Sequence, residues 1–357
     1  MLTFLAQVLP VLVFLLAISL VAEVCDRAGL FDVAGHALVR AARGRVLALW
    51  AGLVLLCLVT TSVLSLDTTA VLVAPVAIAM ARRGGVHPLP FAVTAVWLAN
   101  TGSLLLPVSN LTNLLSGATG SPLAGSFTAH AWAPALAAAG VTVVLVVCFW
   151  PSVVRGRYTL PPAPRPHDRV LLSVCAVVVT ILAVLFACGV SPALPTVAAA
   201  VLLACVFAAR RPQAWRRLTV PWRMALAVLA LFLVVKALGP LFLDNWLASA
   251  LGHGDGPLAW ARVAAVGALG ANGVNNLPAF LALHPGAADS AARSVALLVG
   301  VNAGSVVTPW GSLATLLWLW RCRAAGVEVP LGPHVLRSLV VAVAAVAAGI
   351  GALVLVG

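Results

Sequence analysis

The sequence predicts an all-α membrane protein with about 10 to 12 transmembrane segments, in two inverted repeats that contain broken helices or re-entrant hairpins. Hydrophobic residues make up 63% of the 357 residues and charged residues only 8%, a composition typical of proteins embedded in lipid. Basic residues cluster between the apolar runs, and two runs are interrupted by Asn, Gly and Pro in the same order. Because no polar stretch could form a separate soluble domain, we expect one integral membrane domain over residues 1–357.

A series of apolar runs can cross about 30 Å of hydrocarbon or a good part of it. Some are short or interrupted, so we expect about ten full crossings and re-entrant hairpins for the remainder. The first run lacks a basic leader and a cleavage site, which favours a retained span with the N-terminus outside. The runs are Leu2 to Val24, Val46 to Val63, Thr68 to Ala81, Pro88 to Leu106, Ala131 to Trp150, Val170 to Cys188, Leu194 to Ala209, Met224 to Leu243, Pro257 to Ala271, Leu277 to Leu283, Val295 to Trp320 and Val335 to Val356.

Gly29 to Arg45, between the first two runs, has apolar residues at helical spacing and basic residues towards its end. This pattern is typical of a helix lying in the membrane interface. A plain cytoplasmic loop fits the same residues equally well.

The net charge of +12 is spread over loops and not along one helix face, which argues against nucleic acid as a partner. The clusters between apolar runs follow the positive-inside rule, so we place them in the cytoplasm. We therefore expect a multi-pass protein of the cell membrane with both termini outside. Arg262 and Arg293 are exceptions, and Asp244, His253, Asp255 and Asp289 fall outside. The clusters are Arg27/Arg40/Arg43/Arg45, Arg82/Arg83, Arg155/Arg157/Arg165/Arg169, Arg210/Arg211/Arg216/Arg217/Arg223 and Arg321/Arg323/Arg337.

The cysteines are scattered and include no C-x-x-C pair, so we interpret them as small apolar fillers and expect no disulfide framework, metal site or metalloid trap. No cofactor is expected either. The seven are Cys25, Cys57, Cys148, Cys175, Cys188, Cys205 and Cys322.

Two interrupted segments resemble each other without a gap: "NTGSLLLPVSNLTNLL" from Asn100 and "NAGSVVTPWGSLATLL" from Asn302. Apolar agreement is common in any membrane protein, so the shared order of Asn, Gly, Ser and Pro is the informative part. The coinciding pairs are Asn100/Asn302, Gly102/Gly304, Ser103/Ser305, Pro107/Pro309, Leu111/Leu313, Leu114/Leu316 and Leu115/Leu317.

Each copy follows another broken stretch, around Asp67 and around Asn276. Setting Asp67 against Asn276 requires a different offset and is the weaker alignment. The arginine clusters give equivalent elements opposite orientations, which indicates inverted-topology repeats. We expect repeat 1 over about residues 1–152, linking helices over about 153–223 and repeat 2 over about 224–357. The alternative is that helices rich in Leu, Ala and Val look alike by chance.

The breaks themselves favour a polar cavity. An unpaired backbone group costs several kcal/mol in hydrocarbon, so non-helical backbone survives at membrane depth only beside protein or water. Hydroxyl and amide side chains gather at these breaks, although each taken alone is more often a helix cap or an interhelical hydrogen bond. The candidate pathway residues are Thr68, Thr69, Asn100, Ser103, Ser109, Asn110, Thr112, Asn113, Asn272, Asn275, Asn276, Asn302, Ser305, Thr308, Ser312 and Thr315.

Asp67 is an acidic residue in a predominantly apolar stretch without a basic neighbour within ten positions. A carboxylate at mid-membrane costs roughly 2.5–3.5 kcal/mol, so it calls for a partner or a proton. Two interpretations stay open: a proton-coupling site, or a cap on a helix beginning at Thr68 or Thr69.

The sequence contains no Walker A loop, no H-E-x-x-H and no G-x-S-x-G in a strand-turn-helix context, so we do not expect an enzyme. Transport would draw on an ion gradient or on a partner ATPase. A membrane enzyme or a non-transporting assembly subunit is the alternative class, and an enzyme would gather titratable residues at one membrane face.

The strings "SLDTTAVLVAP", "ANTGSLLLPVSNLTNLL", "GVNNLPAFLAL" and "TPWGSLATLLWLW" resemble the arsenite/antimonite efflux permeases of the ArsB type, within the ion transporter superfamily. The resemblance implies a proton-coupled exporter of neutral trivalent arsenic or antimony hydroxide, sometimes with an ATPase subunit. A homodimer is also open. By position, Asp67 would be the proton-coupling carboxylate. The pathway would be lined by Asn110, Asn275, Asn276, Ser312 and Thr315, with Thr112 as a neighbour.

This chain departs from the family pattern in two respects. Leu66 stands where the family usually has Asn, and the chain is shorter than typical members. Both departures leave the substrate open, and a Na⁺/H⁺ antiporter or a carboxylate transporter of the same superfamily is the alternative within transport.

Overall fold

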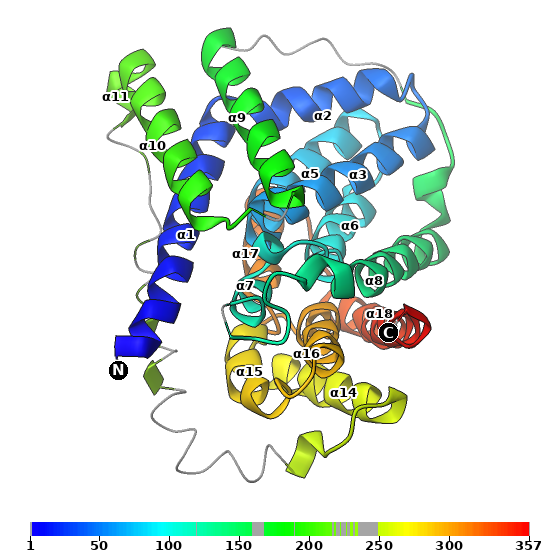
Figure 1. Cartoon of the computed structure of the whole chain (residues 1–357). Helices are drawn as coiled ribbons and strands as arrows, with labels where there is room; N and C mark the ends of the chain where they lie inside the picture. Colours follow the sequence, from blue (N-terminus) through cyan, green and yellow to red (C-terminus); the bar gives the residue numbers. More distant parts are fainter. Residues whose placement is uncertain are drawn as a thin grey trace.

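The computed structural model describes residues 2–118, 120–158, 168–188, 190–215 and 249–356, with isolated positions between 216 and 248 (Figure 1). Regular secondary structure in these ranges is helical, and the β contact there is an isolated bridge between Arg45 and Arg157. The predicted all-α class is therefore confirmed. Most of the predicted run Met224 to Leu243 lies outside the described residues, and so do Arg165, Arg216, Arg217, Arg223 and Asp244.

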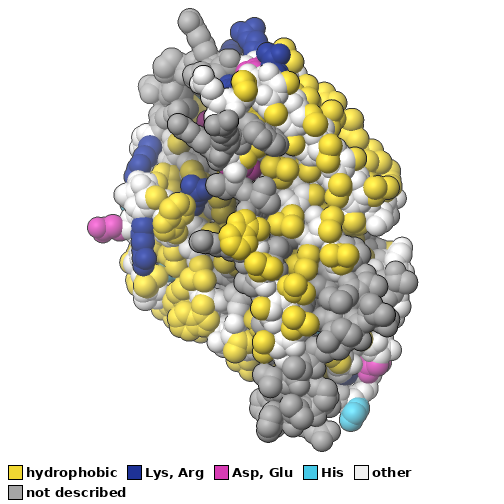
Figure 2. Space-filling view, turned by 90° about the vertical axis from the view of Figure 1, so that its left-hand side faces the viewer, with side chains coloured by type: hydrophobic (Ala, Val, Ile, Leu, Met, Phe, Trp, Pro, Cys, Tyr) yellow, Lys and Arg dark blue, Asp and Glu magenta, His cyan; other side chains and the backbone are white. Residues whose placement is uncertain are grey.

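Five of the described helices are long and apolar enough to cross a membrane. At 1.5 Å per residue, about 20 residues span the hydrocarbon layer. Their outward side chains are apolar, as at Val177, Ile181 and Val343, which are more than half exposed, and Figure 2 shows one broad apolar face. These helices are α3 (Val46–Leu64), α8 (Phe127–Phe149), α9 (Arg169–Ala187), α10 (Ala193–Arg210) and α18 (Leu331–Val356).

The helices form a central group flanked by two pairs. Helix α1 (Leu2–Arg27) packs along α10 on one side, and α8 packs along α18 on the other (Figure 1). Between the pairs lie the interrupted elements, which carry the Asn, Gly, Ser and Pro motifs. The long flanking helices therefore enclose the polar breaks.

The described members of the arginine clusters lie at one end of the molecule, which we call the arginine-rich end. The Tyr158 hydroxyl donates to the Val39 carbonyl, and Arg82 Nη2 donates to the Ala325 carbonyl at 2.6 Å. Arg210 Nε donates to Asp168 Oδ2 at 2.7 Å, and this hydrogen bond lowers the pKa of the Asp168 carboxyl. These contacts bring together, at the arginine-rich end, loops that the positive-inside rule had assigned to the same side.

The two exceptional arginines instead hold backbone at the opposite end. Arg293, only 1% exposed, donates to the carbonyls of Gly252, Gly254 and Gly286 at 2.8–3.0 Å. Arg262 donates to two further carbonyls of the preceding segment. Their role is to satisfy loop carbonyls, which explains why they do not follow the charge rule.

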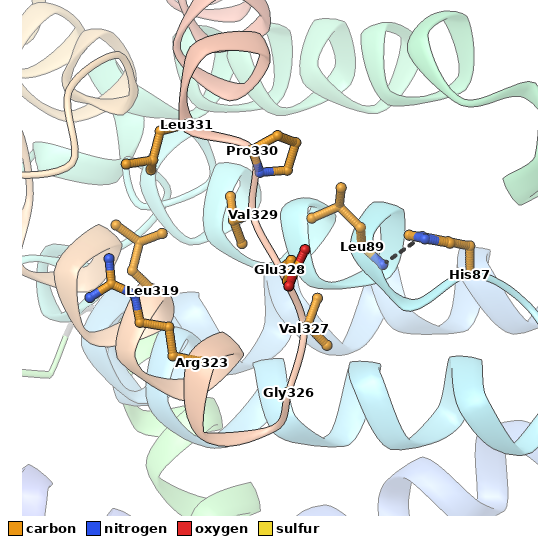
Figure 3. Close-up of a pocket in the computed structure, with 10 residues that line it drawn as sticks. All are labelled: His87, Leu89, Leu319, Arg323, Gly326, Val327, Glu328, Val329, Pro330 and Leu331. Atoms are coloured by element: carbon orange, nitrogen blue, oxygen red, sulfur yellow. Dashed lines mark hydrogen bonds between the residues drawn. The ribbon is translucent and has the colours of Figure 1, made fainter.

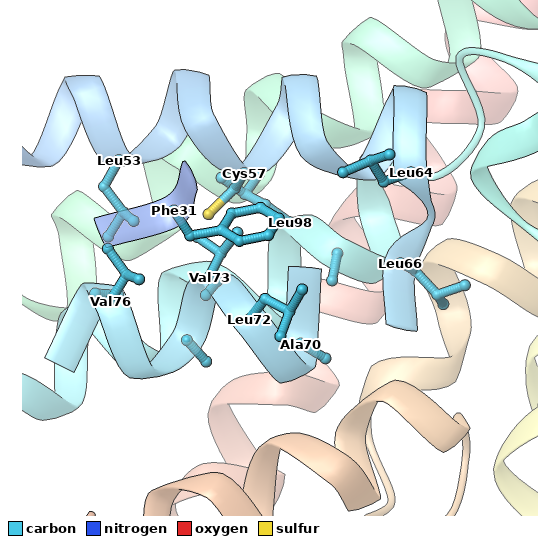
Figure 4. Packing of buried hydrophobic residues seen from close by; sticks show 14 of the residues in the cluster. Phe31, Leu53, Cys57, Leu64, Leu66, Ala70, Leu72, Val73, Val76 and Leu98 are labelled. Atoms are coloured by element: carbon cyan, nitrogen blue, oxygen red, sulfur yellow. The ribbon is translucent and has the colours of Figure 1, made fainter. Parts of the chain in front are cut away.

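The segment Gly29 to Arg45 forms an amphipathic helix, α2 (Leu30–Ala41), and not a plain loop. Its buried residues include Phe31, His36 and Val39. The helix packs against both α3 and α5, and Phe31 lies among their apolar side chains in Figure 4.

A first re-entrant hairpin, hairpin 1, follows α2. Its first arm is α3, which ends at Leu64. The chain then turns through α4 (Leu66–Thr68) into the second arm, which consists of a π-helix η1 (Thr69–Val73) and α5 (Ala74–Arg83). Gly52 on α3 contacts α2, and Val76 on α5 faces Gly35 of α2. The two arms therefore return to the same helix (Figure 4).

The second hairpin, hairpin 2, comprises α14 (Pro257–Val274), α15 (Asn276–Leu283) and the short η5 (His284–Gly286). Gly270 on the first arm faces Ala279 and Leu283 on the second, so this element also turns back on itself. Its open end is near the loops held by Arg293, whereas the open end of hairpin 1 is at the arginine-rich end.

Each hairpin is followed by a broken helix. Broken helix 1 consists of α6 (Pro88–Thr101), η2 (Pro107–Ser109) and α7 (Leu111–Ser116). Broken helix 2 consists of α16 (Ala291–Leu298), a π-helix η6 (Val299–Ala303), η7 (Gly304–Val306) and α17 (Leu313–Ala324).

Broken helix 2 touches hairpin 2 backbone to backbone. A Cβ on Gly300 would come within 2.1 Å of the Ala264 carbonyl oxygen, and one on Gly304 within 2.5 Å of the Ala268 Cβ. Glycine is required at Gly300 because the obstructing atom belongs to the main chain and has no rotamer to change.

The strained backbone at Ser65 gives a testable prediction. Ser65 has φ 122° and ψ 164°, a region that is essentially glycine-only and costs about 1–3 kcal/mol. Ser65→Gly loses the cap at a cost of only a few tenths of a kcal/mol and should raise the unfolding free energy by roughly 1 kcal/mol. Ser65→Ala keeps the strain and loses the cap, so it should lower that free energy by about 0.5–2 kcal/mol.

The measurement is SDS-induced unfolding of the purified protein in mixed micelles. Ser173→Gly is the matched control, because Ser173 is an exposed residue inside α9, where glycine should cost about 0.5–1 kcal/mol. Equal destabilisation by both glycine variants would contradict the assigned backbone geometry.

Candidate functional site

The tips of the two hairpins have the same local geometry. Ser65 and Asn275 both have positive φ, 122° and 106°, with ψ 164° and 151°. Each caps the following helix: Ser65 Oγ accepts from the Thr68 amide, and Asn275 Oδ1 accepts from the Leu277 amide, both at 3.4 Å. When Ser65 is aligned with Asn275, Leu66 and not Asp67 aligns with Asn276. This alignment of the tips is shifted by one residue from the one that the sequence suggested.

The two broken helices also restart in the same way. Asn110 caps α7 with φ −150° and ψ 147°, and Ser312 caps α17 with φ −141° and ψ 151°. These caps correspond at the same offset that pairs Asn100 with Asn302. The tips, the caps and the opposite open ends of the hairpins support inverted repeats, which stay a prediction together with their boundaries.

Four side chains from the two broken helices form a buried cluster, the amide centre: Asn110, Thr112, Asn113 and Asn302. Asn302 Oδ1 accepts from Asn110 Nδ2 at 2.9 Å and from Thr112 Oγ1 at 2.8 Å, and Asn302 Nδ2 donates to Asn113 Oδ1 at 2.9 Å. Each of the four is at most 4% exposed. One amide of broken helix 2 thus binds three polar side chains of broken helix 1.

A second contact joins the broken helices beside this centre. Ser305 Oγ donates to Asn100 Oδ1 at 3.2 Å, while Asn100 Nδ2 donates to the Val96 carbonyl at 2.9 Å. Ser103 donates to the carbonyl of Asn100 within its own helix. Asn100 and Asn302, which the sequence alignment paired, therefore both make contacts between the two broken helices.

The tip of hairpin 2 is bonded to the break in broken helix 2. Asn272 Nδ2 donates to the Gly304 carbonyl at 2.7 Å, and its Oδ1 accepts from the Thr308 amide at 2.9 Å. Asn275 Nδ2 donates to the Trp310 carbonyl at 2.8 Å. Backbone groups that the break frees thus find protein partners, as lipid requires.

Asp67 is not a helix cap. The helix begins at Leu66 and its cap is Ser65, so the interpretation of Asp67 as a cap for a helix at Thr68 or Thr69 is wrong. Asp67 lies in the first turn of α4, and its Oδ1 is buried without a hydrogen-bond partner in the described part of the chain. An unsatisfied buried carboxylate oxygen is costly, so a proton or a ligand at this position would relieve the cost.

Asp67 lies on an element that packs against the polar start of α17. Helix α4 and the π-helix η1 pack against α17, whose N-terminus carries Ser312 and Thr315. Their hydroxyls are 2.9 Å apart and hydrogen-bonded to each other. Asp67 of hairpin 1 is thus on an element that packs against broken helix 2.

The remaining predicted residues form hydrogen bonds within hairpin 1 or between a hairpin and the broken helix that follows it. Thr68 Oγ1 donates to the Leu64 carbonyl, Thr69 Oγ1 pairs with Thr61 Oγ1 at 2.8 Å, and Ser109 Oγ donates to the Ser62 carbonyl. Asn276 is 6% exposed, and its backbone N–H donates to the Gly311 carbonyl at 2.9 Å.

Sequence reasoning missed Ser65, Thr61 and Ser62. Their signal was the polar run Thr60 to Ser62 at the end of an apolar segment, followed closely by Ser65. No residue type in that run marks a positive φ, because serine rarely adopts it. The predicted site therefore began two residues too late at the tip of hairpin 1.

An open pocket occurs at the arginine-rich end, several helical turns from the breaks. It lies between the start of α6, with His87 and Leu89, and the end of α17, with Leu319 and Arg323 (Figure 3). The extended segment around Glu328 closes its third side. None of the predicted pathway residues lines this pocket.

In the described ranges, no group of three or more His, Cys, Asp or Glu side chains could hold a metal ion. What the breaks offer is amides, hydroxyls and one carboxyl group. Such groups can exchange hydrogen bonds with a small polar molecule without covalent chemistry.

The amide centre gives a second prediction. Asn302→Ala leaves the three partners of Asn302 without this amide, and each buried polar group left unsatisfied costs about 1–3 kcal/mol. We expect the unfolding free energy in mixed micelles to fall by roughly 2–4 kcal/mol. Thr142→Ala is the control, because Thr142 is equally buried but binds only the Ala138 carbonyl of its own helix. A loss no larger than that of Thr142→Ala would show that the amide centre does not join the repeats.

Comparison with known proteins identifies the family. A family model described as citrate transporter matches residues 3–298. An arsenical pump membrane protein of Escherichia coli is 30% identical over 328 residues, covering 85% of this chain and 76% of the relative. The arsenical pump membrane protein of Yersinia enterocolitica is 29% identical over the same length and the same shares.

A more distant relative is a 46 kDa membrane protein of Mycobacterium leprae (strain TN), 24% identical over 365 residues, or 94% of this chain and 84% of the relative. The family model covers both hairpins and broken helix 1, and the family model and the arsenical pump relatives concern transporters and not enzymes. Because the family model extends over most of the chain and the arsenical pump proteins align along most of it, this chain is a membrane transporter that belongs to the citrate transporter family, with the arsenical pump membrane proteins among its relatives.

Proposed function

We propose that this protein exports arsenite or antimonite across the cell membrane in exchange for protons. The observation that carries the proposal is the chemistry of the four breaks. They present neutral amides and hydroxyls together with a single carboxyl group, Asp67, one oxygen of which is buried without a partner in the described structure.

Charge favours a neutral substrate. In the described breaks, residues 64–69, 102–111, 275–276 and 304–312, there is no Lys, Arg or His. Trivalent arsenic hydroxide is uncharged near neutral pH and carries three hydroxyl groups, each able to donate and accept a hydrogen bond. Amide side chains such as those of Asn110 and Asn276 can match these groups without paying for a buried charge.

A carboxylate substrate fits the same breaks less well. Citrate is a multiply charged anion, and a buried anion requires a cationic partner or several donors. Asp67 would add repulsion. The family description nevertheless makes a carboxylate carrier the second candidate, and helix N-termini such as those at Asn110, Asn275 and Ser312 would favour negative charge there.

Asp67 supplies the proposed coupling. A proton on this carboxyl group removes a charge that would otherwise be buried, and the substrate hydroxyls would compete for the same oxygen. Proton and substrate would then occupy the site alternately, which is the requirement for exchange. The other pathway residues would hold the substrate or the breaks around it.

The fold supports access from both sides. Hairpin 1 opens at the arginine-rich end and hairpin 2 at the opposite end, so each separates the breaks from one surface. Helix α1 ends and α18 begins near the arginine-rich end, so with this end in the cytoplasm both termini would be outside. We propose that the arginine-rich end is cytoplasmic. An ATPase subunit and a homodimer stay predictions of the family resemblance.

The test uses everted membrane vesicles with an acidic interior, in which export becomes arsenite uptake. We expect wild-type uptake to depend on the pH gradient and Asp67→Asn to reduce it to the level of vesicles without the protein. Asp67→Glu should retain part of the gradient-driven rate because it keeps an ionisable group. Asn276→Ala should slow uptake while its dependence on the gradient remains.

Asp32→Asn is the matched control, since Asp32 is an exposed acid on α2, far from the breaks. Full gradient-driven uptake by Asp67→Asn would overturn the coupling role. Transport of citrate, succinate or Na⁺ without arsenite would make the second candidate or a Na⁺/H⁺ antiporter the function.

A further inference from the structure

Two cysteines that are far apart in the sequence meet away from the breaks. Cys25 is near the arginine-rich end of α1, and Cys175 is in the second turn of α9. Their thiols lie beside each other and interact, and both side chains are fully buried, at 0% exposure. Helices α1 and α9 pack against each other, so a stable helix contact holds this pair of thiols, the Cys25–Cys175 pair.

The pair differs from the other cysteines. Cys148, Cys188 and Cys205 are exposed, whereas Cys57 and Cys322 are buried on α3 and α17. The scattered spacing predicted small apolar fillers at all seven positions, because nothing in the spacing of Cys25 and Cys175 predicts that α1 and α9 are neighbours. Both thiols are free, so each sulfur is available for a new bond.

We propose that Cys25 and Cys175 form a dithiol site for trivalent arsenic or antimony, separate from the transport pathway. Sulfur is a soft ligand and trivalent arsenic a soft acceptor. As(OH)₃ reacts with two thiols to form two S–As bonds. Two As–O bonds break, two water molecules leave with the thiol protons, and one hydroxide stays on arsenic, so no oxidant or reductant is needed.

The position of the pair suits this ligand. Thiols in contact lie close enough for one three-coordinate atom to bridge them, and the uncharged hydroxide can enter an apolar helix contact without a buried charge. A bridge would join α1 to α9 near the arginine-rich end, the side from which the proposed exporter takes its substrate. The inference rests on the proposed function only for the choice of metalloid.

Phenylarsine oxide is the probe, because it forms two S–As bonds with a dithiol and releases one water molecule. The full-length protein, purified and reduced in detergent, is incubated with the probe and washed with a monothiol. It is then unfolded, and the free thiols are labelled with a maleimide and located by peptide mass spectrometry. We expect Cys25 and Cys175 to be protected together, one phenylarsine to be bound per chain, and a competing dithiol to remove it.

Single substitutions test the pairing. Cys25→Ser should abolish protection of Cys175, and Cys175→Ser should abolish protection of Cys25, while the matched buried control Cys57→Ser should keep both protected. Should a serine variant elute as aggregate, alanine replaces serine at that position. Lack of protection in the wild type, or protection of Cys175 that persists without Cys25, would overturn the site.

The dithiol site and the proposed transport function can each be refuted without the other. Protection of the pair in a protein whose vesicles do not take up arsenite would defeat the proposed function and leave the dithiol site in place. Arsenite transport by a protein whose Cys25–Cys175 pair stays unprotected would defeat the dithiol site and leave the proposed function in place.

Discussion

Backbone that leaves its helix inside a bilayer must find hydrogen-bond partners in the protein, and this constraint shapes the centre of the molecule. Asn272 accepts from the Thr308 amide and donates to the Gly304 carbonyl, while Asn275 donates to the Trp310 carbonyl. The side chains that break a helix thus also repair the break of its neighbour. Polar residues are therefore retained in a chain that is otherwise almost entirely apolar.

The same constraint explains what the sequence could reveal. Asn, Gly and Pro within apolar runs indicated the breaks, because few other residue types serve there, and the paired order of Asn100 and Asn302 indicated equivalent elements. Hydropathy could not distinguish a hairpin arm from a full crossing, since α3, the first arm of hairpin 1, is long and apolar enough to span a membrane. The return of a hairpin is visible only in contacts such as that of Gly270 with Ala279.

Finer details depended on backbone geometry that residue types do not specify. Ser65 adopts a conformation that serine rarely takes, so nothing in its identity marked it as the counterpart of Asn275. The alignment of the hairpin tips consequently shifted by one residue, and Asp67 could be read as a cap. The amide centre also escaped prediction as a unit, because hydrogen bonds between Asn302 and residues of the other repeat follow from the packing of the two broken helices.

Gly300 carries a consequence for motion. Its backbone meets that of Ala264 so closely that the first arm of hairpin 2 and broken helix 2 have no side-chain layer between them. Sliding one past the other would force main-chain atoms into collision, so the two elements are mechanically coupled. Any rearrangement that opens the breaks must displace this pair as one rigid unit, with its boundary at the softer, side-chain-filled contacts to the flanking helices.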